Sequence, residues 1–205
     1  MERQKIFVIG DSVSIHYGPY LRKMIKDKFD YDRKRGIEQA LKNLDKPIGA
    51  NAGDSRMVLE YLTEEYQKNL KYDILIINCG LHDIRVDRFS NKIQVELEEY
   101  KLNLIKIIEI SKTIANKVIW IGLTPVIDEI HNLRKEGFLR YGEDVKSYDN
   151  AAKQIMKEYN IPYIDIYNFT KNLGVDIYSD HVHFKDNIKK LQAAFIAGYL
   201  NYIYI

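Results

Sequence analysis

Three residues of the kind used in acyl transfer stand at two distant places in this chain. Ser12 follows a short apolar run near the N-terminus, and Asp180 and His183 lie three residues apart near the C-terminus. Acyl transfer needs a nucleophilic hydroxyl, a base that takes its proton, a group that orients the base, and donors for the oxyanion. Ser12, His183 and Asp180 can fill the first three of these roles.

The choice of base depends on side-chain direction. One turn of backbone can bring the Asp180 carboxylate to Nδ1 of His183 and leave Nε2 facing Ser12. His181 is the alternative base, but in an extended segment it points opposite to Val182, and it has Asp180 only as its immediate neighbour. Each residue also has a structural interpretation without a catalytic role: Ser12 could cap a helix, and His183 could be a partly buried structural histidine.

The elements that must position these residues alternate along the chain. Short apolar runs with strand-forming residues alternate with segments of helical period, which predicts an α/β fold with a parallel sheet between helices. Five strands are expected near residues 5–9, 46–50, 74–77, 118–121 and 163–166, and amphipathic helices over 58–70, 97–115, 145–159 and 188–199. We expect one domain over 1–205, with a loop and short helix in 30–44 and an irregular stretch over 128–142 that could cover a site.

Parallel sheets of this kind bind ligands beyond the carboxyl ends of their strands. The residues at those places include Gly10, Asp11, Ser12, Asn51, Gly53, Asn78, His82, Thr124 and the Asp180 to His183 segment. The sequence therefore predicts a hydroxyl, glycine amides, polar donors and an Asp-x-x-His pair at one edge of the sheet.

These residues resemble the four blocks of the SGNH hydrolases, also called GDSL-like lipases and acylhydrolases. The blocks are Gly10-Asp11-Ser12-Val13-Ser14, Asn51-Ala52-Gly53, Gly80-Leu81-His82-Asp83 and Asp180-His181-Val182-His183, in that order. The resemblance implies a flavodoxin-like three-layer α/β/α fold, with Ser12 as nucleophile and Asp180 and His183 completing a triad. It also implies an oxyanion hole that includes the Ser12 and Gly53 amides, and a structural segment at Gly122-Leu123-Thr124-Pro125.

The third block departs from the family pattern, which usually has Asn where this chain has His82. A neutral imidazole can donate a hydrogen bond as an amide does, provided that the tautomer is right. Three interpretations follow: His82 replaces the donor, His82 turns away and Asn78 or a backbone amide acts instead, or the site is damaged.

Other candidates are weaker. His16 and Tyr17 lie one helical turn after Ser12 and could line a substrate pocket together with Asn78, or pack the first helix. Cys79 is expected to be structural, and Asp11 and Asp83 are expected to hold loop amides. The spacing of His, Cys and acidic residues predicts no metal site and no cofactor.

Composition excludes several other classes of protein. In 205 residues, 31 Lys+Arg against 29 Asp+Glu give a net charge of +2, which is no basic surplus for nucleic acid or an anionic membrane. One cysteine permits no internal disulfide. The N-terminal apolar run is too short for a signal peptide, and no run reaches the roughly 18–20 residues of a membrane span, so a cytoplasmic protein is expected.

These observations favour a serine esterase that removes a short acyl group from a small substrate, with acetylated carbohydrate as one candidate. An acyltransferase or thioesterase could use the same site, and a catalytically degenerate binding protein would explain His82. Nucleotide binding is disfavoured because Gly10-Asp11-Ser12 lacks further glycines at the required spacing.

Overall fold

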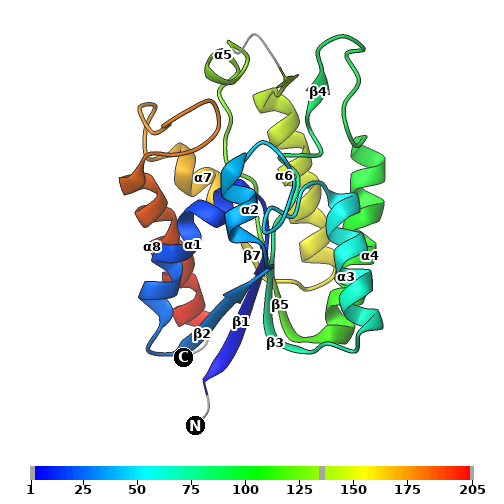
Figure 1. Cartoon of the computed structure of the whole chain (residues 1–205), viewed down its shortest axis with the longest axis vertical. Helices are drawn as coiled ribbons and strands as arrows, with labels where there is room; N and C mark the ends of the chain where they lie inside the picture. The colour runs from blue at the N-terminus through cyan, green and yellow to red at the C-terminus, as the bar shows by residue number, and fades with distance from the viewer. Residues whose placement is uncertain (1–2, 134–136, 204–205) are drawn as a thin grey trace.

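A five-stranded parallel sheet forms the centre of the computed structural model, which describes residues 3–133 and 137–203 (Figure 1). Its order is β2-β1-β3-β5-β7, with every pair parallel. The strands are β1 (Gln4–Ile9), β2 (Phe29–Arg33), β3 (Tyr72–Ile77), β5 (Ala115–Ile121) and β7 (Tyr163–Ile164). The apolar runs of β1, β3 and β5 end in fully buried residues, as expected for strands covered on both faces.

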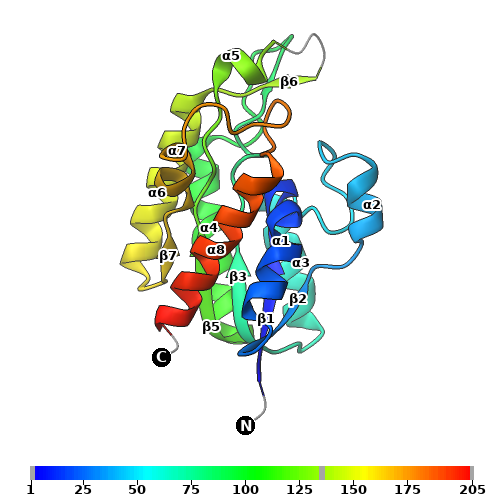
Figure 2. The ribbon, with the colours of Figure 1, turned by 90° about the vertical axis from the view of Figure 1, so that its left-hand side faces the viewer.

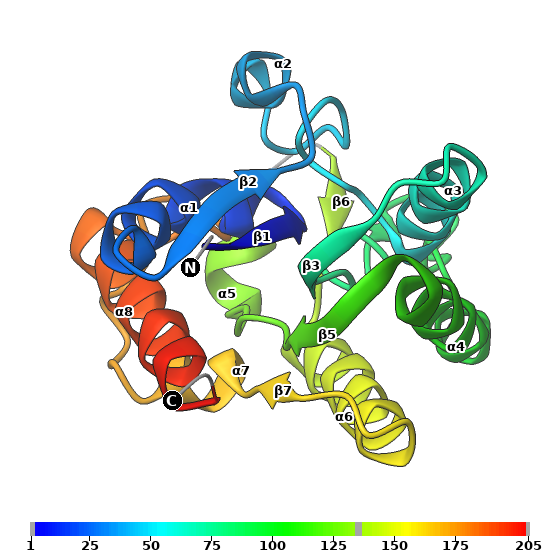
Figure 3. The ribbon, with the colours of Figure 1, turned by 90° about the horizontal axis from the view of Figure 1, so that it is seen from below.

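Helices cover both faces of this sheet, which confirms the predicted three-layer single domain (Figure 3). One layer consists of α1 (Ser12–Ile25) and α8 (Asp186–Ile203), with the short α7 (Ile166–Lys171) beside α8. The other layer consists of α3 (Ser55–Gln67), α4 (Leu97–Ile114) and α6 (Gly142–Glu158). Each helix buries an apolar stripe against the sheet, which is the usual source of helix stability in such folds.

The prediction of a strand at 46–50 is wrong, because the second strand of the chain is β2, at Phe29–Arg33. β2 lies at the edge of the sheet and pairs with β1 alone among the described strands, so charged residues such as the exposed Asp30 are tolerated in it. The short helix expected within 30–44 is present as α2 (Ile37–Lys42), which stands apart from the sheet at the edge of the molecule (Figure 2). Residues 46–50 form an irregular loop that ends in a turn, and Asn51 joins the sheet through an isolated bridge to Gly10.

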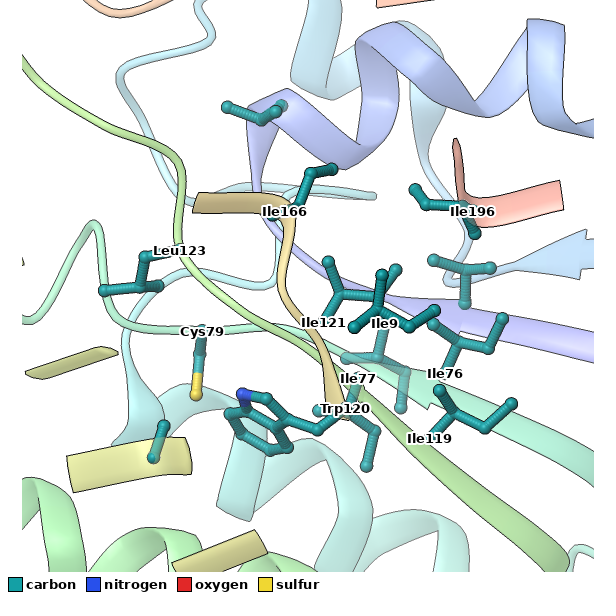
Figure 4. Packing of buried hydrophobic residues seen from close by; sticks show 14 of the residues in the cluster. Ile9, Ile76, Ile77, Cys79, Ile119, Trp120, Ile121, Leu123, Ile166 and Ile196 are labelled. Carbon is teal, nitrogen blue, oxygen red and sulfur yellow. The ribbon is translucent and has the colours of Figure 1, made fainter. Parts of the chain in front are cut away.

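The core lies between the strands and both helical layers. Figure 4 shows Ile9, Ile77 and Ile121 from three neighbouring strands close to Trp120, and all four side chains are fully buried or nearly so. Cys79 belongs to the same cluster, and burial raises the pKa of its thiol well above the ordinary value. This placement fits a structural thiol, as the sequence predicted.

The stretch over 128–142 contains α5 (Asp128–His131) and β6 (Phe138–Leu139), which pairs antiparallel with β4 (Val86–Asp87). Its residues 134–136 lie outside the described part of the chain. Arg140 Nε donates to the Leu81 carbonyl at 2.6 Å, so this stretch rests on the loop that follows β3. Within the described residues, no helix combines the length and apolar character needed to cross a bilayer.

Candidate active site

Three loops far apart in sequence are tied together at the carboxyl edge of the sheet. The Ala52 amide donates to the Gly10 carbonyl at 3.1 Å. Both carboxylate oxygens of Asp83 accept from the Ser55 amide, at 2.9 and 3.0 Å. The blocks that contain Ser12, Gly53 and His82 are therefore neighbours in space, and Asp83 holds a loop amide as expected.

The start of α1 presents Ser12. Asp11 is the residue that caps this helix, because its Oδ1 accepts from the Val13 amide at 2.9 Å and from the Ser14 amide at 3.4 Å. The capping interpretation of Ser12 is therefore wrong, and its hydroxyl does not bond to the helix. Gly10 is required just before, because a Cβ there would lie 2.8 Å from the Ser14 hydroxyl.

A continuous chain of hydrogen bonds joins Ser12, His183 and Asp180. His183 Nε2 lies 2.8 Å from Ser12 Oγ, and its Nδ1 lies 2.7 Å from Asp180 Oδ2. The other oxygen of Asp180 accepts from the Val182 and His183 amides at 2.9 and 2.7 Å, which fixes the carboxylate. Ser12 and His183 are only 7% and 3% exposed, so water competes little for these bonds.

The charge state of Asp180 follows from the same contacts. Partial burial raises the pKa of the carboxyl, but the hydrogen bonds from His183 and from the Val182 amide outweigh burial and hold the pKa well below its usual range. The carboxylate is therefore ionised at neutral pH. An ionised partner at Nδ1 keeps Nε2 of His183 available as an acceptor for the Ser12 proton.

His181 faces a different part of the site. Its Nε2 lies 3.3 Å from Asp45 Oδ1, and its ring packs edge-on against His131 at 4.7 Å between centroids. The Ser12 hydroxyl makes its hydrogen bond instead to His183, whose Nε2 accepts it. His183 therefore contacts Ser12, and His181 contacts Asp45.

The two backbone amides predicted to form an oxyanion hole differ in their hydrogen bonds. The Ser12 amide has no acceptor within the described chain, whereas the next two amides of α1 are capped by Asp11. The Gly53 amide donates to Asn51 Oδ1 at 3.2 Å. Gly53 has φ +76°, and a Cβ there would lie 2.5 Å from Met57 Sδ, so this position requires glycine.

His82 is a buried neutral imidazole with one nitrogen unoccupied. Its Nε2 lies 3.5 Å from Arg85 Nη2, and since a guanidinium only donates, Nε2 is the acceptor and the ring proton sits on Nδ1. Burial, followed by the charges of Arg85 and Arg140, lowers the pKa of His82 well below its ordinary value. Nδ1 has no hydrogen-bond partner in the described chain although it is buried. Nδ1 of His82 is the ring nitrogen bonded to Cγ, and the amide nitrogen of an asparagine side chain is bonded to Cγ in the same way.

Asn78 and Tyr17 do not lie where a substrate could reach them, contrary to expectation. The Asn78 amide nitrogen donates to the carbonyls of Ile121 and Gly122 at 3.0 and 2.9 Å, so both of its hydrogens are used. Tyr17 is 2% exposed and belongs to the core. Both residues line an internal cavity of about 10 Å³, which is room for no more than one water.

His16 does lie against His183. Its ring packs edge-on against that of His183, with 4.7 Å between centroids. Burial, together with the charges of His183 and Lys189, lowers the pKa of His16 to about 4, so the ring is neutral at pH 7. This position is consistent with the predicted contact to a substrate.

Several side chains that surround the site could not be found by reasoning from the sequence. Arg85, Arg140 and Asp45 contact the site histidines, and Arg140 Nη1 lies 3.0 Å from His131 Nε2. Arg85 follows His82 by three residues, and this spacing was the only feature of the sequence that suggested a contact between these side chains. All five histidines of the protein belong to this cluster: His16, His82, His131, His181 and His183. In the described chain, no three His, Cys, Asp or Glu side chains come together as metal ligands would.

A parallel sheet that carries serine, histidine and aspartate in one hydrogen-bonded chain at its carboxyl edge is the arrangement of an α/β/α hydrolase. The profile of the GDSL-like lipase/acylhydrolase family matches residues 6–196, and the chain belongs to this family. Membership implies a hydrolase that acts on esters. No curated protein matches the chain by sequence.

Several solved structures share the fold. A lipolytic G-D-S-L family member from Veillonella parvula gives a TM-score of 0.68 at 14% identity, over 96% of this chain and 98% of its own. A lipase/acylhydrolase from Enterococcus faecalis gives 0.62 at 19% identity, over 96% and 95%. A catalytic mutant of an acetylxylan esterase from Geobacillus stearothermophilus gives 0.68 at 16% identity, over 94% and 92%.

Proposed function

We propose that the protein is a serine esterase that hydrolyses a short-chain carboxylic ester through an acyl-enzyme on Ser12. The observation that carries this proposal is the hydrogen-bonded chain from Ser12 Oγ through His183 to Asp180, with distances of 2.8 and 2.7 Å. Such a chain has the order of nucleophile, base and orienting acid.

In the first half of the reaction, Ser12 Oγ attacks the ester carbonyl carbon while its proton passes to His183 Nε2. The tetrahedral intermediate collapses when the bond to the alcohol oxygen breaks, and His183 returns the proton to that oxygen. Asp180 keeps the imidazole in place and stabilises its charged form. The alcohol leaves and the acyl group stays on Ser12.

In the second half, water attacks the acyl carbon and gives a proton to His183 Nε2. The bond to Ser12 Oγ then breaks and takes that proton back, which releases the carboxylic acid and restores the enzyme. The oxyanion that forms in both halves needs donors, and the amides of Ser12 and Gly53 and the Nδ1 proton of His82 are the proposed set.

A short acyl group on a polar alcohol is the substrate class we favour, with acetylated carbohydrate as an example. The similarity to an acetylxylan esterase supports this class, although at 16% identity it concerns the fold alone. The alternative in which His82 marks a degenerate binding protein predicts an unreactive Ser12.

The proposal is tested by a fluorophosphonate probe together with a panel of p-nitrophenyl esters and acetylated sugars. We expect Ser12 to be labelled, as peptide mass spectrometry would show, and acetyl esters to be turned over faster than long-chain esters. Absence of labelling in folded protein would overturn the serine mechanism. A faster rate with an added alcohol acceptor than with water would instead identify an acyltransferase.

Replacement of His82 tests its proposed role as an oxyanion donor. His82→Ala removes a donor aimed at developing charge, and such a donor contributes roughly 10² to 10³ in kcat, with little effect on KM. We expect a loss of that size in p-nitrophenyl acetate hydrolysis. A wild-type rate in this variant would contradict the role.

His82→Asn is the matched variant, because its amide nitrogen occupies the same bonded position as Nδ1. We expect it to recover part of the lost rate. In a protein that is otherwise wild type, Arg85→Met should reduce kcat, because Arg85 fixes the tautomer of His82. In a protein that already carries His82→Asn, the same change should have little effect, because an asparagine amide has no tautomer to fix.

A further inference from the structure

A large groove opens beside the candidate active site, between α1, β2, α2 and α8. Its volume is about 780 Å³, and its floor contains apolar side chains from α1 and α2, namely Ile15, Pro19, Ile37 and Leu41. Figure 2 shows α2 standing away from α1 on this side of the molecule. The groove has the size of a small-molecule site.

Its walls carry unbalanced positive charge. Six basic and two acidic residues line the groove. The two acidic residues are already paired, Asp32 with Arg35 at 2.9 Å and Asp186 with Lys190 at 2.8 Å. By contrast, none of the described carboxylates lies within 4.0 Å of the charged groups of Arg22, Lys23, Lys26 or Lys189. The groove therefore presents a positive potential to solvent.

A buried arginine that lines the groove, Arg33, adds to its positive potential. Arg33 is 7% exposed, and its Nη2 donates to Ser14 Oγ at 3.2 Å and to the Ala50 carbonyl at 3.1 Å. Its Nε and Nη1 make no hydrogen bond of normal geometry, and the guanidinium pairs with no carboxylate of the described chain. Burying a charge without a countercharge is costly, and a bound anion would reduce that cost.

The groove reaches the catalytic residues at one end. His16 lines it and also packs against the ring of His183. Lys189 lines the same end, and its charge acts on His16. Arg22 follows Ser12 by ten residues, which places it about 15 Å further along the axis of α1. A molecule whose ester lies at Ser12 could extend from Lys189 towards Arg22.

We propose that this groove binds the alcohol part of the substrate through a negatively charged group, a carboxylate or a phosphate, with Lys189 as the first cation it meets. The inference rests on the proposed esterase function and adds a charge requirement to it. The enzyme would then prefer anionic esters over neutral ones of the same acyl group.

Three acetates with the same aromatic ring test the proposal: phenyl acetate, 4-acetoxybenzoate and 4-acetoxyphenyl phosphate. Lys189→Gln should lower kcat/KM for the two anionic esters by about fivefold, the size of one exposed charge pair, and the double variant with Arg22→Gln by more. Phenyl acetate should change less than twofold. The two anionic esters distinguish a carboxylate site from a phosphate site.

Lys189→Arg keeps the charge and should keep the preference, and Lys106→Gln, an exposed change on α4 outside the groove, should affect no substrate. An equal loss on all three acetates in Lys189→Gln, or no loss on any, would overturn the proposal. If no ester is hydrolysed, the esterase function fails, and calorimetric titration with benzoate and inorganic phosphate still decides the inference. Binding must then weaken in Lys189→Gln, and its absence in wild type would refute the anion site.

Discussion

Ser12→Ala is expected to reduce ester hydrolysis by about 10³-fold or more, because no acyl-enzyme can form without the hydroxyl. The fold should be unaffected. Asp11, not Ser12, caps α1, and among the residues that the structure describes the Ser12 hydroxyl bonds only to His183. Steady-state kinetics with p-nitrophenyl acetate and a thermal unfolding curve would measure the two effects. Turnover close to wild type would remove Ser12 from the mechanism.

Ser14→Ala is a matched control two residues away. The Ser14 hydroxyl donates to the Asp11 carbonyl at 2.6 Å and accepts from Arg33, so its loss should reduce the free energy of unfolding by about 1–2 kcal/mol. Activity should remain near wild type at a temperature where the variant is folded. The two serines would thus separate catalysis from stability.

His183→Ala is the second variant with a large expected effect, a fall in kcat of about 10³-fold or more. The imidazole is the only described group that bonds to the Ser12 hydroxyl, so its removal leaves no base for the proton. His181→Ala should keep most of the rate, since His181 faces Asp45. The reverse ranking of these two variants would show that the base is misassigned.

The pH profile offers an independent check on the base. Activity should fall at acid pH, because a protonated base cannot accept the proton of Ser12. His16, whose pKa is about 4, stays neutral from pH 5 to 8, and Asp180 stays ionised there. Neither of these two groups can produce an acid limb in that range. Burial lowers the pKa of His82 as well, which moves its protonation to more acid pH. Asp180→Asn should slow turnover while substrate binding remains.

The positions of the candidate catalytic residues could be predicted from sequence because each residue follows a strand end or precedes a helix, where position is set by local elements. Ser12 follows the apolar run of β1, and the Asp180 to His183 spacing is closed by local hydrogen bonds. The strands with both faces buried were predictable for a similar reason, because burial on both sides selects a continuous apolar run.

The features of the fold and site that could not be predicted depend on tertiary contacts, which leave no local pattern in the sequence. β2 was missed because an edge strand with one partner tolerates Asp30 and Asp32. The placement of Asn78 on two main-chain carbonyls, and of Arg140 on a loop 59 residues away, follows from packing between segments. Helical period alone could not show that Tyr17 points into the core.

All five histidines lie at one end of the sheet, so we expect the two ends of the molecule to differ in their stability at acid pH. His16 and His82 are held neutral in the fold, with pKa values below those of an unfolded chain, so the unfolded chain binds more protons as the pH falls. For His16, the resulting loss of stability begins near pH 6.5 and is complete near pH 4. The opposite end, where the strands of the sheet begin, contains no histidine. Mild acid should therefore loosen the loops around Ser12 while the sheet behind them stays folded.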